Sequence, residues 1–278
     1  MQIADLHVHT TASDGTWQPE PLVKTALDKG LAMIAVTDHD TTQGVSAVRE
    51  MGEEHGLAVL SGVELSVDYN DAEIHLLGLG IEPRHPELMD VLQQLHASRY
   101  DRGRRMVEKL QEQGIAVSFA RVEELAGNSL IGRPHVARAL VENGYADTIG
   151  DAFVKYVGKG CPAYVPRYKI APAEAVRIIH AAGGVAIWAH PGLSEQDELL
   201  PYLASHGLDG LEAYHSAHQP HQVSHYLDLA MRMHLLVSGG SDCHGPGMRE
   251  QLLLGTVPFP LEEAERLVAA CQKYRCYN

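Results

Sequence analysis

Short apolar runs rich in β-branched residues alternate along the chain with longer stretches of amphipathic pattern. The first pattern is typical of buried strands, and the second is typical of helices that cover them. The runs predict seven strands, at residues 3–6, 33–37, 58–63, 74–79, 185–188, 210–213 and 235–238. Seven strands with helices between most of them favour an α/β fold whose sheet closes, or nearly closes, into a barrel.

The pattern changes between about residues 86 and 168, where a long charged helical stretch is followed by shorter helical pieces and no clear strand. We therefore expect two domains: a barrel of residues 1–85 and 169–278, and a helical insertion of residues 86–168. The segment KGCPAYVPR is rich in Gly and Pro, which predicts a loop by which the chain returns to the barrel.

The amino-acid composition excludes some classes of binding partner and favours a metal ion. With 22 Lys and Arg against 36 Asp and Glu, the net charge is −14, which disfavours an extended nucleic-acid surface or an anionic membrane surface as partner. The first residues, MQIADLHVHT, lack the apolar stretch of a signal peptide, and the four cysteines form no CxxC pair, so we expect a cytoplasmic protein. The 17 histidines, against 3 Phe and 2 Trp, point to metal binding.

Clusters of His, Asp and Glu stand where the predicted strands end. In a barrel of parallel strands the carboxyl ends open onto one face, so these side chains should converge there. Residues two apart on an extended chain point to one side, and pairs such as His7 with His9 can therefore reach one ion. The clusters are DLHVH at 5–9 followed by Asp14, DHD at 38–40, Glu64, His190, Glu212 with His215, and DCH at 242–244.

His75 differs from the others because it lies early in its strand. A two-residue turn at positions 70 and 71 would pair Asp68 with Glu73 and would place His75 diagonal to Glu64 on one face of a hairpin. Diagonal neighbours are roughly 7–8 Å apart at Cα, which lets a carboxylate and an imidazole share a metal ion.

These residues give the chain a resemblance to the PHP (polymerase and histidinol phosphatase) phosphoesterases. The motifs are HVHTTASDG at 7–15, TDHDT at 37–41, GVELS at 62–66, Glu-x-His around His75, WAHP at 188–191 and GGSDCHG at 239–245. The resemblance implies a distorted seven-stranded (β/α) barrel that holds three divalent ions. It assigns His7, His9, Glu64 and Asp242 to the first ion, Asp14, His39 and His244 to the second, and Glu64, His75 and His190 to the third.

The ligand types bear on the metal and the reaction. Many members of the family have His where this chain has Asp14, and the extra carboxylate favours manganese, with zinc or iron as alternatives. Such a centre suits a phosphate dianion and its hydrolysis, with inorganic phosphate as product. The leaving group also needs an acid, for which the candidates are Asp38, Asp40, His215 and His218.

Basic residues of the insertion are candidates for binding substrate. Arg133, Pro134 and His135 open a helical pattern, and a helix N-terminus favours anions. Lys159 and Arg167, in the returning loop, would close the other side of the substrate. The arrangement of Arg133 and His135 is similar to that of one PHP subgroup, the nucleoside 3′,5′-bisphosphate phosphatases and related 5′→3′ exoribonucleases.

That similarity implies a small nucleotide substrate whose 3′-phosphate is removed to leave a 5′-monophosphate such as AMP, with the 5′ end of short RNA as a second substrate. Two alternatives remain open. One is a histidinol phosphatase with the same metals and a different cap, and the other is a non-catalytic PHP module.

Overall fold

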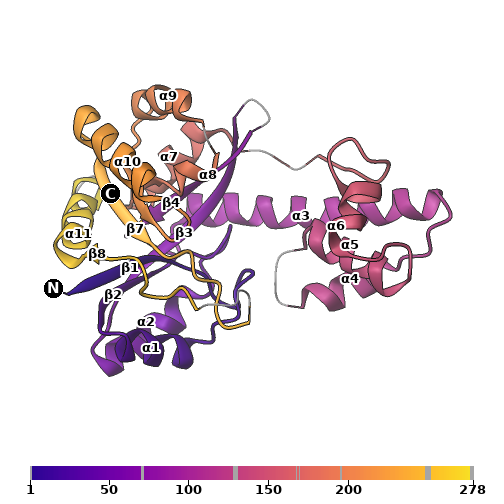
Figure 1. Cartoon of the computed structure of the whole chain (residues 1–278), viewed down its shortest axis with the longest axis horizontal. Helices are drawn as coiled ribbons and strands as arrows, with labels where there is room; N and C mark the ends of the chain where they lie inside the picture. Colours follow the sequence, from indigo (N-terminus) through magenta and orange to yellow (C-terminus); the bar gives the residue numbers. More distant parts are fainter. Residues whose placement is uncertain are drawn as a thin grey trace. The chain divides into compact units, whose positions relative to one another are not determined.

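The computed structural model describes residues 2–69, 72–127, 131–166, 168, 170–194, 196–247 and 252–275. The chain divides into two compact units, Met1–Asp90 with Lys169–Asn278 and Val91–Tyr168. The division after residue 90 falls inside one long helix, α3, Pro86–Glu112 (Figure 1). None of the described helices is both long enough and apolar enough to cross a bilayer.

One sheet of eight strands organises the first unit, in the order β7-β6-β5-β4-β3-β2-β1-β8. The strands are β1 Ile3–Val8, β2 Leu31–Val36, β3 Ala58–Tyr69, β4 Ala72–Leu79, β5 Val185–Trp188, β6 Gly210–His215, β7 Leu236–Gly240 and β8 Phe259–Pro260. Six of them run parallel, while β4 is antiparallel to both of its neighbours and β8 is antiparallel to β1. Every expected strand is present, and β8 is additional because two residues are too few to show a period.

The two edges of the sheet approach each other. The His9 N–H donates to the Cys243 carbonyl oxygen over 3.1 Å, and Val8 forms a parallel bridge with Cys243 just beyond the end of β7. The sheet is therefore a nearly closed barrel, as the strand pattern indicates.

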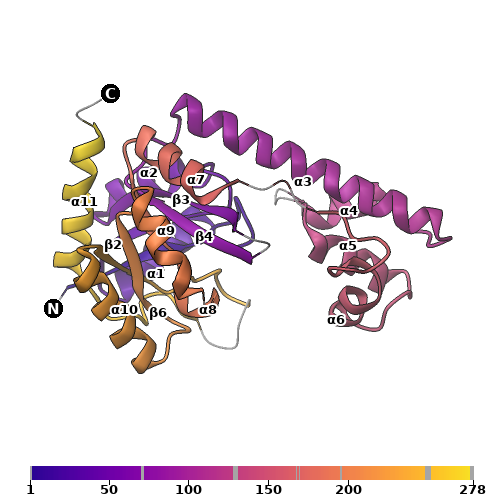
Figure 2. The same cartoon turned by 90° about the horizontal axis from the view of Figure 1, so that it is seen from above.

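Helices cover the outside of this barrel and close one end of it. They are α1 Pro19–Asp28, α2 Val45–His55, α7 Pro172–Ala181, α8 Pro191–Ser194, η2 Asp197–Leu199, α9 Leu200–Ser205, α10 Pro220–Met233 and α11 Leu261–Arg275. Leu267 and Cys271 of α11 share a core with Ala4 and Val185, which lie at the starts of their strands. In both views α11 lies on the side of the N-terminus, and the joined ends of β3 and β4 point away from it (Figure 1, Figure 2). The apolar core with α11 therefore covers the amino ends of these strands, and the polar residues lie toward the carboxyl ends.

The second unit consists of helices with a core of their own. Besides most of α3 it contains α4 Phe119–Ala126, α5 Arg133–Glu142, α6 Ile149–Ala152 and a π-helical turn, η1, Phe153–Val157. Its buried residues include Met106, Leu110, Val122, Val136 and Leu140. No strand is formed by the described residues of this unit.

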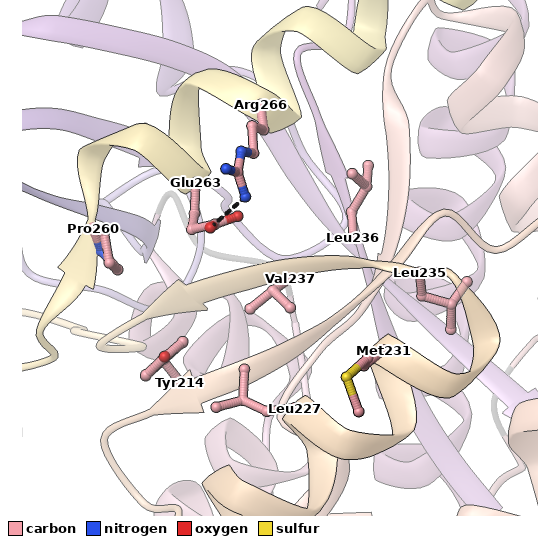
Figure 3. Close-up of a pocket in the computed structure, with 9 residues that line it drawn as sticks. All are labelled: Tyr214, Leu227, Met231, Leu235, Leu236, Val237, Pro260, Glu263 and Arg266. Carbon is pink, nitrogen blue, oxygen red and sulfur yellow. Dashed lines mark hydrogen bonds and ion pairs between the residues drawn. The ribbon is translucent and has the colours of Figure 1, made fainter.

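A hollow of about 330 Å³ opens between α10 and α11 over β6 and β7 (Figure 3). Most of its lining is aliphatic, and Arg266 pairs with Glu263 over 2.7 Å at its edge. Tyr214 lines the hollow, whereas His215, the next residue of β6, lies in a group with His7. Neighbouring strand residues face opposite sides of a sheet. The hollow therefore lies on the outer side of the sheet, opposite to the side that carries the histidines.

Closure of the barrel depends on Gly240, because a Cβ there would overlap the Cβ and backbone nitrogen of His7. We expect Gly240→Ala to lower the free energy of unfolding by about 1–3 kcal/mol, the usual cost of overpacking. Urea unfolding measures this change. The control is Gly150→Ala, whose Cβ would meet only Thr148 Oγ1, at 3.7 Å, and should have little effect. Equal losses in the two variants would contradict the steric argument.

Candidate metal centre

Five parallel strands bring distant residues to one face of the barrel, four of them from their carboxyl ends and β3 from Glu64 in its middle. β1 and the loop after it supply His7, His9 and Asp14, the segment after β2 supplies His39, β3 supplies Glu64, and the segments after β5 and β7 supply His190, Asp242 and His244. These are the side chains that the strand-end clusters placed together, and they come from both ends of the sequence.

His75 reaches the same face because β4 runs in the opposite direction, so the start of β4 lies beside the ends of the parallel strands. The hairpin pairs Asp68 with Glu73 and Ser66 with His75, which confirms the expected register and puts His75 diagonal to Glu64. Residues 70 and 71, the expected turn, lie outside the described residues.

Glu64 lies at the centre of the cluster and is fully buried. Its Oε2 atom is 3.1–3.2 Å from ring nitrogens of three histidines, and its Oε1 atom is 2.8–3.0 Å from those of two others. The first three are His7, His9 and His39, and the other two are His75 and His190. Burial alone would raise the pKa of the Glu64 carboxyl, but the surrounding imidazoles hold it well below its usual value.

Two further carboxylates extend the cluster. Asp242 Oδ1 is 3.1 Å from His9 Nε2 and 3.5 Å from His7 Nε2. Half-exposed Asp14 lies 3.4 Å from His244 Nε2 through Oδ1, and 3.9 Å from His39 Nε2 through Oδ2. Burial opposes ionisation of both, yet the neighbouring histidines lower the pKa of each carboxyl.

The surroundings of His9 indicate that these side chains suit a metal cation. The ring is fully buried, and neither nitrogen forms a hydrogen bond with any described residue, although Nε2 is 3.1–3.2 Å from oxygens of Asp242 and Glu64. Buried polar atoms normally have a partner. His9 belongs to two groups whose donor atoms lie within 4.8 Å of one another: His7, His9, Glu64 and Asp242, and His9, Asp14, His39 and His244. This mixture of imidazole and carboxylate donors fits manganese, iron or zinc.

The backbone is strained where it delivers these side chains. Asp40, His190 and Asp242 have φ values of 51°, 31° and 53°, in the left-handed region that non-glycine residues rarely adopt. Such conformations cost about 1–3 kcal/mol each and persist where neighbours hold them. The Asp40 N–H donates to the Glu64 carbonyl oxygen over 2.9 Å, and the His190 N–H donates to a buried carboxylate of β6.

Two of the four candidate acids have their polar atoms engaged by the protein. Asp38 is buried and accepts hydrogen bonds of 2.6–2.7 Å from the Thr10 N–H, the Thr10 hydroxyl and the Ser13 hydroxyl. It therefore holds the loop that leads to Asp14, and these bonds argue against an acid role. His218 donates from Nδ1 to the Ala213 carbonyl and accepts the Gly192 N–H on Nε2, and burial lowers its pKa.

Asp40 and His215 complete the set of candidates. Asp40 is buried and accepts the Ser66 N–H over 2.9 Å. His215 accepts the Ala217 N–H on Nδ1 over 3.1 Å, so the ring proton is on Nε2. That buried N–H forms no hydrogen bond within the described part of the chain, and Asp242 Oδ2 lies 3.6 Å from it.

Glu212 is the residue whose role the sequence left unassigned. It is fully buried, with Oε1 2.9 Å from His7 Nδ1 and Oε2 accepting the His190 N–H over 2.7 Å. Burial would raise the pKa of this carboxyl, but His7 above all keeps it low. Its position in the cluster at the end of β6 was the available signal, although a strand-end carboxylate can be either a ligand or a support.

The expected substrate residues lie in the second unit, apart from one that is not described. The guanidinium of Arg133 lies over the Phe153 ring, 5.3 Å from its centroid. His135 Nδ1 accepts the Gly132 N–H over 3.0 Å at the start of α5, which leaves the ring proton on Nε2. Lys159 is exposed after η1, and Arg167 lies outside the described residues.

Metal binding should release protons. Burial opposes protonation of His9, but Asp242 and Glu64 outweigh it and raise its pKa to about 10. In the metal-free protein the ring is therefore charged at about pH 8, and it must lose a proton to ligate a metal ion. We expect manganese affinity to rise as the pH rises toward that pKa. Calorimetry at one pH, in two buffers of different ionisation enthalpy, should show proton release.

The control for this measurement is His55→Gln, an exposed histidine at the end of α2, which should release the same number of protons as the wild type. Binding heats that do not depend on the buffer would show that His9 is neutral before metal binds.

Comparison with known proteins shows the family to which the chain belongs. The PHP domain model matches residues 5–158. The 5′-3′ exoribonuclease Rnm of Salmonella typhimurium is 39% identical over 251 residues, 88% of this chain and 86% of that protein. The 3′,5′-nucleoside bisphosphate phosphatase of Chromobacterium violaceum is 34% identical over 249 residues, 87% of each chain. A crystal structure from Bifidobacterium adolescentis, described as a metal-dependent phosphoesterase, has a TM-score of 0.82 at 35% identity over 96% of each chain. The chain belongs to the PHP domain family and is a metal-dependent phosphoesterase.

Proposed function

We propose that the protein hydrolyses the 3′-phosphate of nucleoside 3′,5′-bisphosphates to give 5′-monophosphates such as AMP and inorganic phosphate, with short RNA bearing a 5′-phosphate as a second substrate. The observation that carries this proposal is the cluster of nine imidazole and carboxylate side chains that has Glu64 at its centre. Two relatives are named for these two activities, which supports one chemistry for both substrates.

We infer three divalent ions, with manganese preferred and zinc or iron as alternatives. His7, His9, Glu64 and Asp242 would hold the first, Asp14, His39 and His244 the second, and Glu64, His75 and His190 the third. In support, the donor atoms of the first two sets lie within 4.8 Å of one another, and His75 and His190 lie against the same oxygen of Glu64. When bound, such ions supply an activated water and offset the negative charge of the phosphate.

The chain's own groups have separate tasks in this reaction. Asp38 orders the loop before Asp14 by accepting hydrogen bonds from Thr10 and Ser13. His215 accepts the Ala217 N–H on Nδ1, which leaves its Nε2–H as the donor on the side of Asp242. His215 therefore stabilises charge on the ester oxygens by donating a hydrogen bond.

The 5′-phosphate is assigned to the second unit. Arg133 can form paired charge-assisted hydrogen bonds with a phosphate, and its stacking on Phe153 restricts the side chain before substrate binds. His135 adds an Nε2 donor at the start of α5, where the helix dipole favours an anion. Lys159 and Arg167 are proposed as further contacts with the substrate.

Loss of the His215 donor should slow the chemical step. We expect His215→Ala to lower kcat for adenosine 3′,5′-bisphosphate by about 10²-fold, the usual effect of removing one such donor. The loss should be smaller for p-nitrophenyl phosphate, whose leaving oxygen needs less stabilisation. Steady-state kinetics at saturating manganese measure the kcat loss for each substrate. The basic limb of the pH–kcat profile should survive in the variant, and its disappearance would make His215 a general acid instead.

Recognition of the 5′-phosphate can be tested apart from the metal centre. Arg133→Ala should lower kcat/KM for adenosine 3′,5′-bisphosphate by about 10²-fold, which corresponds to about 3 kcal/mol for one Arg–phosphate contact. Hydrolysis of p-nitrophenyl phosphate, which lacks that group, should change little. Arg133→Lys should recover part of the loss, because the ammonium keeps the charge without the planar fork.

The same assays can refute the substrate assignment. Equal losses on both substrates would mean that Arg133 supports the fold or the metal centre. A wild-type preference for histidinol phosphate over the bisphosphate would replace the nucleotide assignment with the other phosphatase activity.

A further inference from the structure

Glu212 joins two proposed metal ligands that come from different strands. Its Oε1 atom lies 2.9 Å from His7 Nδ1, at the end of β1, and its Oε2 atom accepts the His190 N–H over 2.7 Å, just after β5. The carboxylate is fully buried in β6. A group so placed acts on both ligands at once.

On His7, the carboxylate decides which nitrogen keeps the ring proton. Because Glu212 accepts at Nδ1, the lone pair of a neutral His7 is on Nε2, which faces Glu64 Oε2 at 3.2 Å and Asp242 Oδ1 at 3.5 Å. A ligating histidine commonly gives its other N–H to a carboxylate in this way, and that partner fixes both the tautomer and the ring orientation.

On His190, the same carboxylate holds the backbone. The φ of His190 is 31°, a conformation that needs support in a residue other than glycine, and its N–H is tied to Glu212 Oε2. The ring then reaches Glu64 Oε1 with Nε2 at 3.0 Å. Without the acceptor, the N–H would lose its bond and the backbone could relax, carrying the ring away from Glu64.

Glu212 is not placed as a ligand itself. Its donor atoms do group with those of His7 and His215. However, His7 Nδ1 and His215 Nε2 both carry protons in the hydrogen-bond pattern, so neither has a lone pair to offer an ion there.

We propose that Glu212 is a positioning residue, which fixes the tautomer of His7 and the backbone of His190 so that ligands from β1 and β5 meet their metal ions together. This inference rests on the proposed function, in which both histidines are ligands.

Asp209 offers a matched control because it has the same chemistry at the other end of β6. Its Oδ2 atom accepts the Ala186 N–H over 2.9 Å and lies 2.7 Å from His180 Nε2, and its Oδ1 atom accepts the Tyr274 hydroxyl over 2.7 Å. None of these partners is a proposed ligand. Replacing Asp209 therefore perturbs the same strand without touching the metal centre.

The test compares manganese binding by Glu212→Gln and Asp209→Asn, measured as free manganese by electron paramagnetic resonance, with thermal unfolding of the metal-free proteins alongside. The Gln side chain has one acceptor oxygen and cannot serve both donors. We expect Glu212→Gln to weaken manganese binding by about 10–100-fold. Asp209→Asn should lower stability but leave manganese affinity unchanged. Unchanged affinity in Glu212→Gln, or an equal loss in Asp209→Asn, would overturn the proposal.

The variant Glu64→Gln distinguishes failure of this inference from failure of the proposed function on which it rests. If Glu64→Gln binds manganese as the wild type does, the proposed ligand set is wrong. If Glu64→Gln loses the metal while Glu212→Gln keeps it, the positioning role alone fails. Should Glu212→Gln not fold, long-range ¹H–¹⁵N spectra of the zinc-loaded wild type decide, since the proposal requires the His7 proton on Nδ1 and a proton on Nε2 would refute it.

Discussion

A single buried carboxylate, Glu64, lies within hydrogen-bond distance of five imidazoles, and the rest of the unit can be understood as the means of keeping it there. A buried charge is costly unless it is compensated. The barrel brings these five imidazoles to one face from four separate parts of the chain. One of them, His75, comes from the reversed strand β4, where it lies diagonal to Glu64 in the hairpin.

Around this centre the acidic residues divide into two kinds. Glu64, Asp14 and Asp242 face the proposed ligand atoms of the histidines, whereas Asp5, Asp38 and Glu212 accept hydrogen bonds from backbone N–H groups behind the centre. Asp5, for example, is fully buried and accepts the N–H groups of Ser241, beside Asp242, and of Gly255, over 2.8 and 2.9 Å. The second kind hold backbone segments beside the proposed ligands, and Glu212 and Asp5 do so next to the strained residues His190 and Asp242, so the geometry of the centre does not depend on the ligands alone.

The net charge of −14 is a property of the whole chain, whereas binding of a phosphate ester depends on the local charge of the centre. Exposed acidic side chains are screened by water and salt, whereas the buried cluster combines carboxylates with imidazoles that ions can turn into a positively charged site. An acidic protein can therefore still bind an anionic phosphate ester, provided that recognition is local. The phosphate contacts that we propose at the start of α5 would also be local, since one phosphate needs only a few donors.

The sequence by itself determined the α/β pattern, the convergence of nine candidate ligands and the register of the β3–β4 hairpin. Those features follow from short-range rules, namely residue period, the two-residue spacing of His7 and His9, and turn length. Only the tertiary structure decided which carboxylates face the centre and which support it, because Glu212 and Asp38 find their partners 205 and 28 residues away. It likewise decided which ring nitrogen of His215 accepts a hydrogen bond, since the backbone N–H of Ala217 reaches Nδ1 through a local fold that no residue pattern specifies.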